Sequence, residues 1–234
     1  MIRRLHLLYI IIICACARAS AQVGELRNDF AIGVNGGYLL NRVSFNPTIK
    51  QSWKGGETFG ITLRYTCEKY FSAFCALQAE VNYANMGWKE LIETSSDTYY
   101  RDMRYVQLPI FARLAWGKER RGLQFFFMIG PQLGFFLSDT EHRGGEWSNE
   151  TLYARPNRVV AQYDLDVERK FEYGLAGGIG MELNTKIGHF TLEGRYFYAL
   201  SDMFNNGKKD PFGRSANGAI YVKAGYLFDI IRTK

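Results

Sequence analysis

The sequence has 234 residues, of which 47% are hydrophobic, 15% aromatic and 22% charged, and its formal net charge is +6 at pH 7. It has no basic block with interleaved aromatic residues, which argues against a nucleic-acid-binding protein. Charged or strongly polar residues interrupt every apolar run after residue 21, which excludes a transmembrane helix. The spacings Cys-x-x-Cys and His-x-x-x-His do not occur, so we expect no structural metal site.

The first 21 residues have the three parts of a secretory signal peptide. Arg3 and Arg4 form a basic region, an apolar run extends from Leu7 to about Ala17, and Ala19-Ser20-Ala21 offers a cleavage site. The apolar run is shorter than the roughly 20 residues that a membrane-spanning helix needs. A lipoprotein signal around Cys16 is the alternative, and the clean Ala-Ser-Ala site argues against it. We therefore expect export and removal of residues 1–21.

Eight later segments alternate apolar residues with polar or small ones at a period of two, which is the pattern of a strand whose faces meet different surroundings. In the segment from Tyr105 to Trp116, every even position is apolar. Each segment has the roughly 9 to 11 residues with which a tilted strand crosses a bilayer. The predicted strands are Phe30 to Leu40, Thr58 to Cys67, Ser72 to Met86, Tyr105 to Trp116, Leu123 to Leu137, Phe171 to Leu183, His189 to Leu200 and Ala219 to Ile230.

The connections between these strands alternate in length. Three are short, at residues 68–71, 117–122 and 184–188, and the others are longer, at 41–57, 87–101, 138–170 and 201–218. An even strand number with this asymmetry is typical of outer-membrane barrels. We predict an all-β fold, an eight-stranded antiparallel transmembrane β-barrel with short periplasmic turns and long extracellular loops. The predicted domains are a signal peptide at 1–21 and an outer-membrane β-barrel domain at 22–234.

The two faces of the strands differ in kind, since one is apolar and bulky and the other combines charged or amide residues with Gly and Ala. A soluble barrel such as a lipocalin would turn the apolar face inward, around a ligand cavity. We favour apolar residues outward, because small residues suit a narrow interior and aromatic residues gather near the strand ends, as in interfacial girdles. The predicted interior polar network is Arg64, Glu80, Gln107, Arg113, Glu172, Glu182, Glu193, Arg195, Lys223 and Asp229.

The charges of this interior network are nearly balanced, with five acidic and four basic side chains. Eight strands enclose a lumen that side chains just fill. Because an unpaired buried charge costs several kcal/mol, we expect the network to be paired and to leave no substantial channel. We expect no cofactor, no nucleic acid and no small-molecule substrate.

Some eight-stranded outer-membrane barrels modify lipid A, and Ser138, Asp139 and His142 lie where a predicted strand enters its loop, which suggests an enzymatic hypothesis. A Ser and a His four residues apart in a loop are more often unrelated, since a catalytic pair also needs an orienting acid and an oxyanion donor. We therefore predict no catalytic residues and no enzyme.

The connection at 138–170 is the longest in the chain and carries many charges, together with Trp147, Tyr153 and Tyr163. Loops longer than about 15 residues are usually functional or disordered. A solvated cap is one interpretation. The other is a surface that binds a protein partner through these three aromatic residues.

Cys67 and Cys75 are the cysteines that remain after the signal peptide, and they flank a predicted turn. They could form one disulfide in an exported protein. We slightly favour two small apolar residues that face lipid.

The sequence "RYVQLPIFARLAWG" resembles the Tyr-hydrophobic-(Glu/Gln)-(Ile/Leu)-Pro motif of the PorT-like outer-membrane barrel family of Bacteroidota. "FFMIGPQLGFFLSD", "EYGLAGGIGMEL" and "FTLEGRYFYALSDMF" resemble later strands of that family, so the resemblance covers essentially the whole mature chain. The last strand carries Lys223, Gly225, Phe228 and Ile230 at a spacing that resembles the C-terminal insertion signal of outer-membrane barrels, although Ile231 to Lys234 extend past it.

The resemblance implies an eight-stranded barrel in the outer membrane, and the family's namesake is needed for type IX protein secretion. We expect a non-enzymatic barrel that assists this secretion, with outer-membrane lipid and other secretion-machine proteins as partners. A structural or adhesive surface barrel of the OmpX or OmpA membrane-domain kind is the alternative. A lipid A-modifying enzyme is the third hypothesis.

Overall fold

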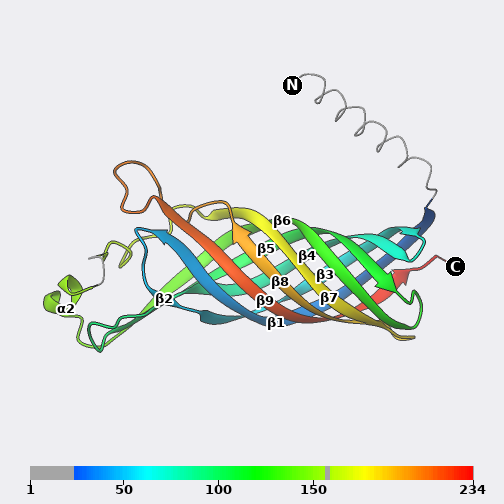
Figure 1. Cartoon of the computed structure of the whole chain (residues 1–234), viewed down its shortest axis with the longest axis horizontal. Helices are drawn as coiled ribbons and strands as arrows, with labels where there is room; N and C mark the ends of the chain where they lie inside the picture. The colour runs from blue at the N-terminus through cyan, green and yellow to red at the C-terminus, as the bar shows by residue number, and fades with distance from the viewer. Residues whose placement is uncertain (1–23, 156–158, 234) are drawn as a thin grey trace, which may run out of the picture.

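The computed structural model describes residues 24–155 and 159–233, and the predicted signal peptide at 1–21 lies outside the described residues. Eight long strands dominate the fold (Figure 1). Their bounds are β1 Glu25–Asn46, β3 Lys54–Tyr70, β4 Ala73–Glu90, β5 Thr98–Gly117, β6 Gly122–Gly144, β7 Phe171–Asn184, β8 His189–Ala199 and β9 Arg214–Ile231. A two-residue strand, β2 (Gln51–Ser52), pairs with the end of β4, and a short helix, α2 (Asn149–Tyr153), lies in the longest loop.

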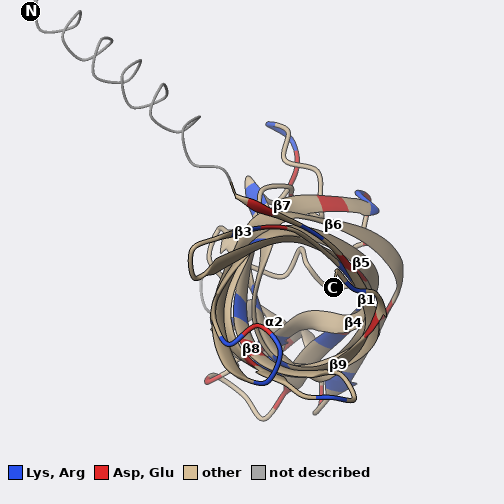
Figure 2. Ribbon diagram, turned by 90° about the vertical axis from the view of Figure 1, so that its right-hand side faces the viewer, with Lys and Arg blue, Asp and Glu red and all other residues tan. Residues whose placement is uncertain are grey.

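The eight long strands form a closed antiparallel ring, which Figure 2 shows from one end. Each strand pairs with the next one along the chain, and β1 pairs with β9 over residues 30–46 and 214–231. Closure leaves none of the eight with an unpaired edge, so their backbone N–H and C=O groups bond within the sheet. The all-β antiparallel prediction is confirmed.

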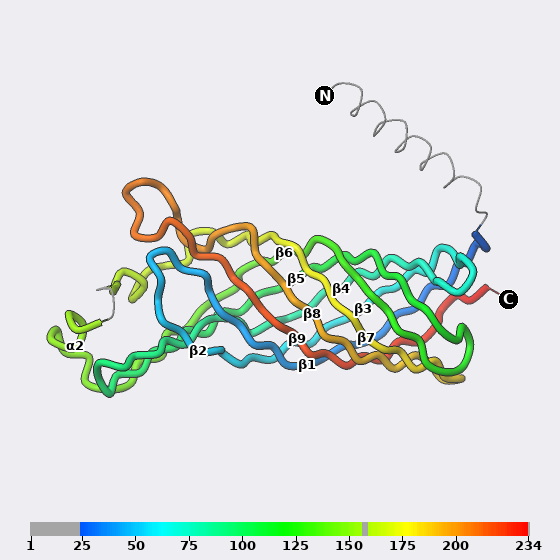
Figure 3. Tube along the Cα trace, viewed as in Figure 1, coloured from blue at the N-terminus to red at the C-terminus, as the bar shows by residue number. Residues whose placement is uncertain are grey.

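The two ends of the ring differ in the length of their connections (Figure 3). Residues 71–72, 118–121 and 185–188 make short turns at one end, which we call the short-turn end. The described chain also begins and finishes there. The long connections and α2 gather at the opposite, loop end, so the structure has the alternation that the sequence predicts.

Several strands continue further toward the loop end than the sequence predicts. The predicted ends at Leu40 and Leu137 were wrong, since β1 continues to Asn46 and β6 to Gly144, and β5 begins at Thr98 instead of Tyr105. A register shift between β5 and β6 at Arg104/Tyr105 changes which alternate residues of β6 face inward, while β5 keeps its alternation. Polar residues then occupy both faces, so the alternation that marks a strand disappears while backbone pairing continues.

The ring turns its polar face inward and its apolar face outward. Side chains on alternate positions of β9 show the pattern, because Lys223 is 1% exposed while the adjacent Val222 is 58% exposed. Phe, Leu, Ile and Tyr side chains on the outer face are similarly exposed on every long strand. The orientation is the one expected from the sequence and the reverse of a soluble lipocalin-like barrel. No helix in the described ranges is long and apolar enough to cross a membrane.

Candidate functional site

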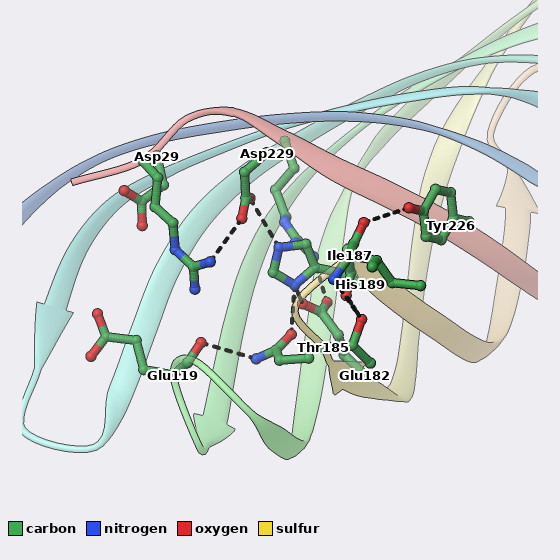
Figure 4. Close-up of polar contacts among 12 residues, drawn as sticks. Asp29, Glu119, Glu182, Thr185, Ile187, His189, Tyr226 and Asp229 are labelled. Atoms are coloured by element: carbon green, nitrogen blue, oxygen red, sulfur yellow. Dashed lines mark hydrogen bonds and ion pairs between the residues drawn. The ribbon is translucent and has the colours of Figure 1, made fainter. Parts of the chain in front are cut away.

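The interior of the ring holds ion pairs in layers, and the first layer lies near the short-turn end. Glu182 accepts a hydrogen bond from Arg113 (Nη2 to Oε2, 2.6 Å), contacts Arg64, and lies 3.1 Å from Nδ1 of His189. His189 also lies 2.9 Å, through Nε2, from Asp229 (Figure 4). A cavity of about 50 Å³ adjoins this layer. The negative charges of Glu182 and Asp229 are therefore balanced by the positive charges of Arg64 and Arg113, and His189 contacts both acids.

The second layer is centred on Glu80 of β4, and the side chains that contact Glu80 are all buried. Glu80 accepts hydrogen bonds from Lys223 (3.0 Å) and from Nη1 of Arg195 (2.8 Å). Arg195 also contacts Glu193, and Gln78 and Asn82 donate to the two oxygens of Glu80 at 2.7 and 2.9 Å. Two acids and two bases again give a neutral set, all within the sheet interior. Burial of such charges is tolerated only when their partners are complete.

The third layer is polar but lacks a cation. Gln107 donates to Tyr221 at 3.0 Å, and Asn217 donates to Glu172 at 2.6 Å. The second oxygen of Glu172 has no hydrogen-bond partner among the described residues. Asn41 joins the layer by donating to Asn217 at 3.2 Å. In the part of the chain that the structure describes, the carboxyl group of Glu172 therefore has no paired cation, unlike the acids of the first two layers.

Between these layers and the loops, four aromatic side chains fill the interior at the loop end. This aromatic plug consists of Phe45, Trp88, Phe204 and Phe212, with ring centroids 5.1 to 6.5 Å apart. All four are almost completely buried. The guanidinium of Arg101 lies 5.5 Å from the Trp88 ring and pairs with Asp139 and Glu141. Side chains therefore fill the ring from the short-turn end to the loop end.

The structure brings together the ten residues predicted as an interior polar network. Nine of them are buried in the three layers, and Asp229 is partly exposed at the short-turn end, where it pairs with His189 and Arg232. The layers also contain His189, Asn217 and Tyr221, which were not predicted as members. For Asn217 and Tyr221 the signal was available, since both share the inward alternation of Lys223.

The predicted insertion signal divides between the two faces of β9. Lys223 belongs to the second layer, and Phe228 and Ile230 are exposed on the outer face. Gly225 pairs with Asn35 and Thr191 on the flanking strands.

In the connection between β6 and β7, residues 145–155 and 159–170 form a cap at the loop end. Trp147 and Tyr163 pack against each other and against Tyr99, with centroids 4.8 to 5.9 Å apart. Both rings are partly buried by this packing, and the binding of a protein partner by the three aromatic residues stays a prediction. Tyr153 of α2 is 81% exposed and remains available to a partner.

Asp97, in the connection between β4 and β5, holds this cap in place. Its Oδ1 accepts from the backbone N–H groups of Glu146 (3.1 Å) and Trp147 (3.3 Å), and its Oδ2 accepts from Arg155 (2.9 Å). Burial favours the neutral acid, but the hydrogen bonds to the carboxylate outweigh it and hold the pKa of Asp97 at about 2. Tyr163 adds a second attachment by donating to Glu90 at 2.7 Å.

Ser138, Asp139 and His142 lie within β6 and do not form a catalytic group. Asp139 points to Arg101, and His142 stacks on Tyr100 and lies 3.0 Å from Asp102. Ser138 and His142 are four positions apart along the strand, which corresponds to roughly 13 Å of backbone. In the described ranges, no three His, Cys, Asp or Glu residues are grouped as metal ligands.

Cys67 and Cys75 are free in the structure, and the thiol of Cys67 donates to the backbone oxygen of Cys75 at 3.2 Å. Both are partly exposed, at the end of the β3–β4 hairpin where the register shifts between Thr66 and Glu68. The hairpin is thus held by strand pairing.

The chain has weak similarity to three solved outer-membrane proteins. Ail, the attachment invasion locus protein of Yersinia pestis, is 14% identical with a TM-score of 0.37, covering 85% of this chain and 98% of that one. Neisserial surface protein A is 11% identical with a TM-score of 0.43, over 85% and 97%. OprG of Pseudomonas aeruginosa is 16% identical with a TM-score of 0.43, over 88% and 98%. No curated protein matches the sequence.

A family model gives a more direct assignment. Residues 20–205 match the model of the outer membrane protein beta-barrel domain, which covers most of the 234 residues. Every strand from β1 to β8 falls in this range. The chain therefore belongs to the outer membrane protein beta-barrel domain family.

Proposed function

We propose that the chain is an integral, non-enzymatic protein of the outer membrane that crosses the bilayer with its eight long strands and acts through its loop end. The observation that carries this proposal is the inverted distribution of side chains, ionic within the ring and apolar outside it. Each large apolar side chain transferred out of water gains roughly 1.5–3 kcal/mol, so an outer face rich in Phe, Leu and Ile favours contact with lipid.

The asymmetry of the two ends supports one orientation in the membrane. Barrels of the outer membrane have short turns on the periplasmic side and long loops on the outer side. The chain would accordingly expose the cap, with Tyr153, to the cell exterior. The charge layers and the aromatic plug support a closed barrel, because a pore needs a lumen free of side chains.

Insertion and closure are tested together in one preparation. The mature chain, refolded into lipid vesicles, is expected to float with the vesicles, to migrate differently before and after boiling, and to give no discrete single-channel conductance in planar bilayers. Protein that stays soluble without detergent would overturn the membrane assignment. Discrete conductance steps from the folded form would overturn the closed interior.

The finer role proposed is assistance of type IX protein secretion, and it is supported by the resemblance of residues 104–117 to the PorT-like motif. Deletion of the gene should reduce the export of cargo that carries the C-terminal secretion signal. Normal export would leave the alternative, a structural or adhesive surface barrel, as the better account. Lipid A modification is disfavoured by the separation of Ser138 and His142, and His142→Ala should leave the lipid A mass spectrum unchanged.

A further inference from the structure

A groove of about 290 Å³ lies on the outer face of the ring near the loop end, where β8, β9 and β1 run side by side. Its centre is Gly218 of β9, which pairs with Tyr198 on one side and Arg42 on the other. Two strand spacings, about 10 Å, separate these flanking residues. The groove exists because the central position has no side chain, and a Cβ at Gly218 would meet nothing closer than the Tyr196 hydroxyl at 3.5 Å.

The walls of the groove combine aromatic rings with Arg42, and Arg214 lies beside the groove against the outer side chain of Tyr198. Arg42 lies over the Trp53 ring at 5.2 Å, and Arg214 lies over the Tyr198 ring at 5.4 Å and donates to its hydroxyl. Tyr196 forms the wall toward the middle of the ring. Each guanidinium thus lies over an aromatic ring, and its five N–H donors leave groups free for a ligand.

These two arginines differ from five other cations of the loop end. Lys50, Lys54, Arg101, Arg143 and Arg155 each have a carboxylate partner within 4.0 Å. Arg42 and Arg214 form no ion pair with any residue in the described ranges, and no acidic residue of those ranges lines the groove. Two uncompensated positive charges therefore face outward over the same strands, so charge complementarity calls for an anion.

The position of the groove along the length of the strands indicates which molecule supplies that anion. Ile220 and Val222 continue the same outward-facing row of β9 toward the short-turn end, and both are exposed apolar residues. If the apolar face lies in the bilayer, as the proposed function holds, the groove lies where hydrocarbon gives way to head groups of the outer leaflet. Aromatic and arginine side chains are favoured at that level.

We propose that this groove binds the phosphorylated sugar head group of an outer-leaflet glycolipid. Arg42 and Arg214 pair with phosphate, for which the planar guanidinium supplies parallel N–H donors. Tyr196, Tyr198 and Trp53 contact the sugar, and the acyl chains continue down the apolar face past Ile220. The inference rests on the proposed membrane insertion, and it adds a specific lipid to it.

The test uses the full mature chain in detergent, with native mass spectrometry as the readout for bound lipid. The probes are bisphosphorylated lipid A, the same lipid after removal of its phosphates, phosphatidylglycerol and inorganic phosphate. We expect the bisphosphorylated form to bind most tightly, and we expect Arg42→Gln and Arg214→Gln each to weaken it about tenfold. The matched control is Arg104→Gln, since Arg104 is an exposed arginine on β5, away from the groove.

A second variant tests the groove without changing charge. Gly218→Leu should fill the centre of the groove and weaken lipid A binding to a similar degree, while heat-modifiable migration shows that the ring still folds. Equal binding by the parent and both groove variants would overturn the proposal, as would an equal loss in Arg104→Gln. Equally tight binding of phosphatidylglycerol or inorganic phosphate would overturn the glycolipid assignment. Failure of the parent chain to enter vesicles would instead overturn the proposed function.

Discussion

Removal of Glu80 should destabilise the protein strongly, because this carboxylate neutralises two buried cations. Lys223 and Arg195 approach it to 3.0 and 2.8 Å. At an effective dielectric constant of 20, one such pair is worth roughly 5 kcal/mol of Coulomb energy, against a desolvation cost of several kcal/mol per ion. Breaking a buried pair on one side costs about 3–5 kcal/mol, and we expect Glu80→Gln to lower the free energy of unfolding by that amount.

If Glu80 pairs with Lys223 and Arg195, removal of one cation together with Glu80 should restore the balance of charge in the second layer. Lys223→Met alone leaves the second layer with an excess acid, whereas Glu80→Gln combined with Lys223→Met leaves Arg195 paired with Glu193. We expect the double variant to be more stable than the sum of the two single effects by about 2 kcal/mol. Equilibrium unfolding in urea, followed by tryptophan fluorescence in lipid vesicles, measures all four proteins. Additive effects to within about 0.5 kcal/mol would refute the paired layer.

Two further predictions concern the cap and the strand contacts. The contact of Asp97 with the cap stabilises the fold above its ordinary pKa of 3.8 and is lost as the pH falls toward about 2, so protection of the Trp147 amide from hydrogen exchange should fall between pH 4 and pH 2. Constant protection over this range, or an unchanged cap in Asp97→Asn, would contradict the attachment. Gly130→Ala should cost about 1–3 kcal/mol, since its Cβ would lie 1.9 Å from the backbone oxygen of Ile110, whereas Gly194→Ala, with nothing within 4 Å, should change stability by less than about 0.5 kcal/mol. Equal effects of the two substitutions, compared by unfolding in urea, would contradict the strand spacing.

The sequence predicted the strands where the two faces meet different surroundings. From Leu123 to Leu137 the alternation is clear, because lipid-side and interior positions select different residues, and β6 covers that range. Beyond Leu137, charged and polar residues occur on both faces, and the pattern gives no indication that pairing continues to Gly144. Sequence alternation therefore predicts the apolar band of the ring and not the full length of its strands.

The candidate sites were predictable to different degrees for a similar reason. Membership of the interior network follows from alternation, so residues such as Glu80 and Arg195 could be assigned without coordinates. Which acid pairs with which base depends on contacts across the ring, such as the one between Arg64 and Glu182, 118 positions apart. The inward packing of Trp147 and Tyr163 depends on where the loop folds back, and no local pattern encodes that path.

The side-chain orientation on β9 can be measured directly with spin labels. In a background where Cys67 and Cys75 are replaced by Ala, single labels would be attached through Val222→Cys and Ile220→Cys, and the refolded protein placed in lipid vesicles. Both labels should collide freely with dissolved oxygen and be shielded from a water-soluble nickel reagent. Exposure of either label to the nickel reagent, with shielding from oxygen, would contradict an apolar face that lies against lipid.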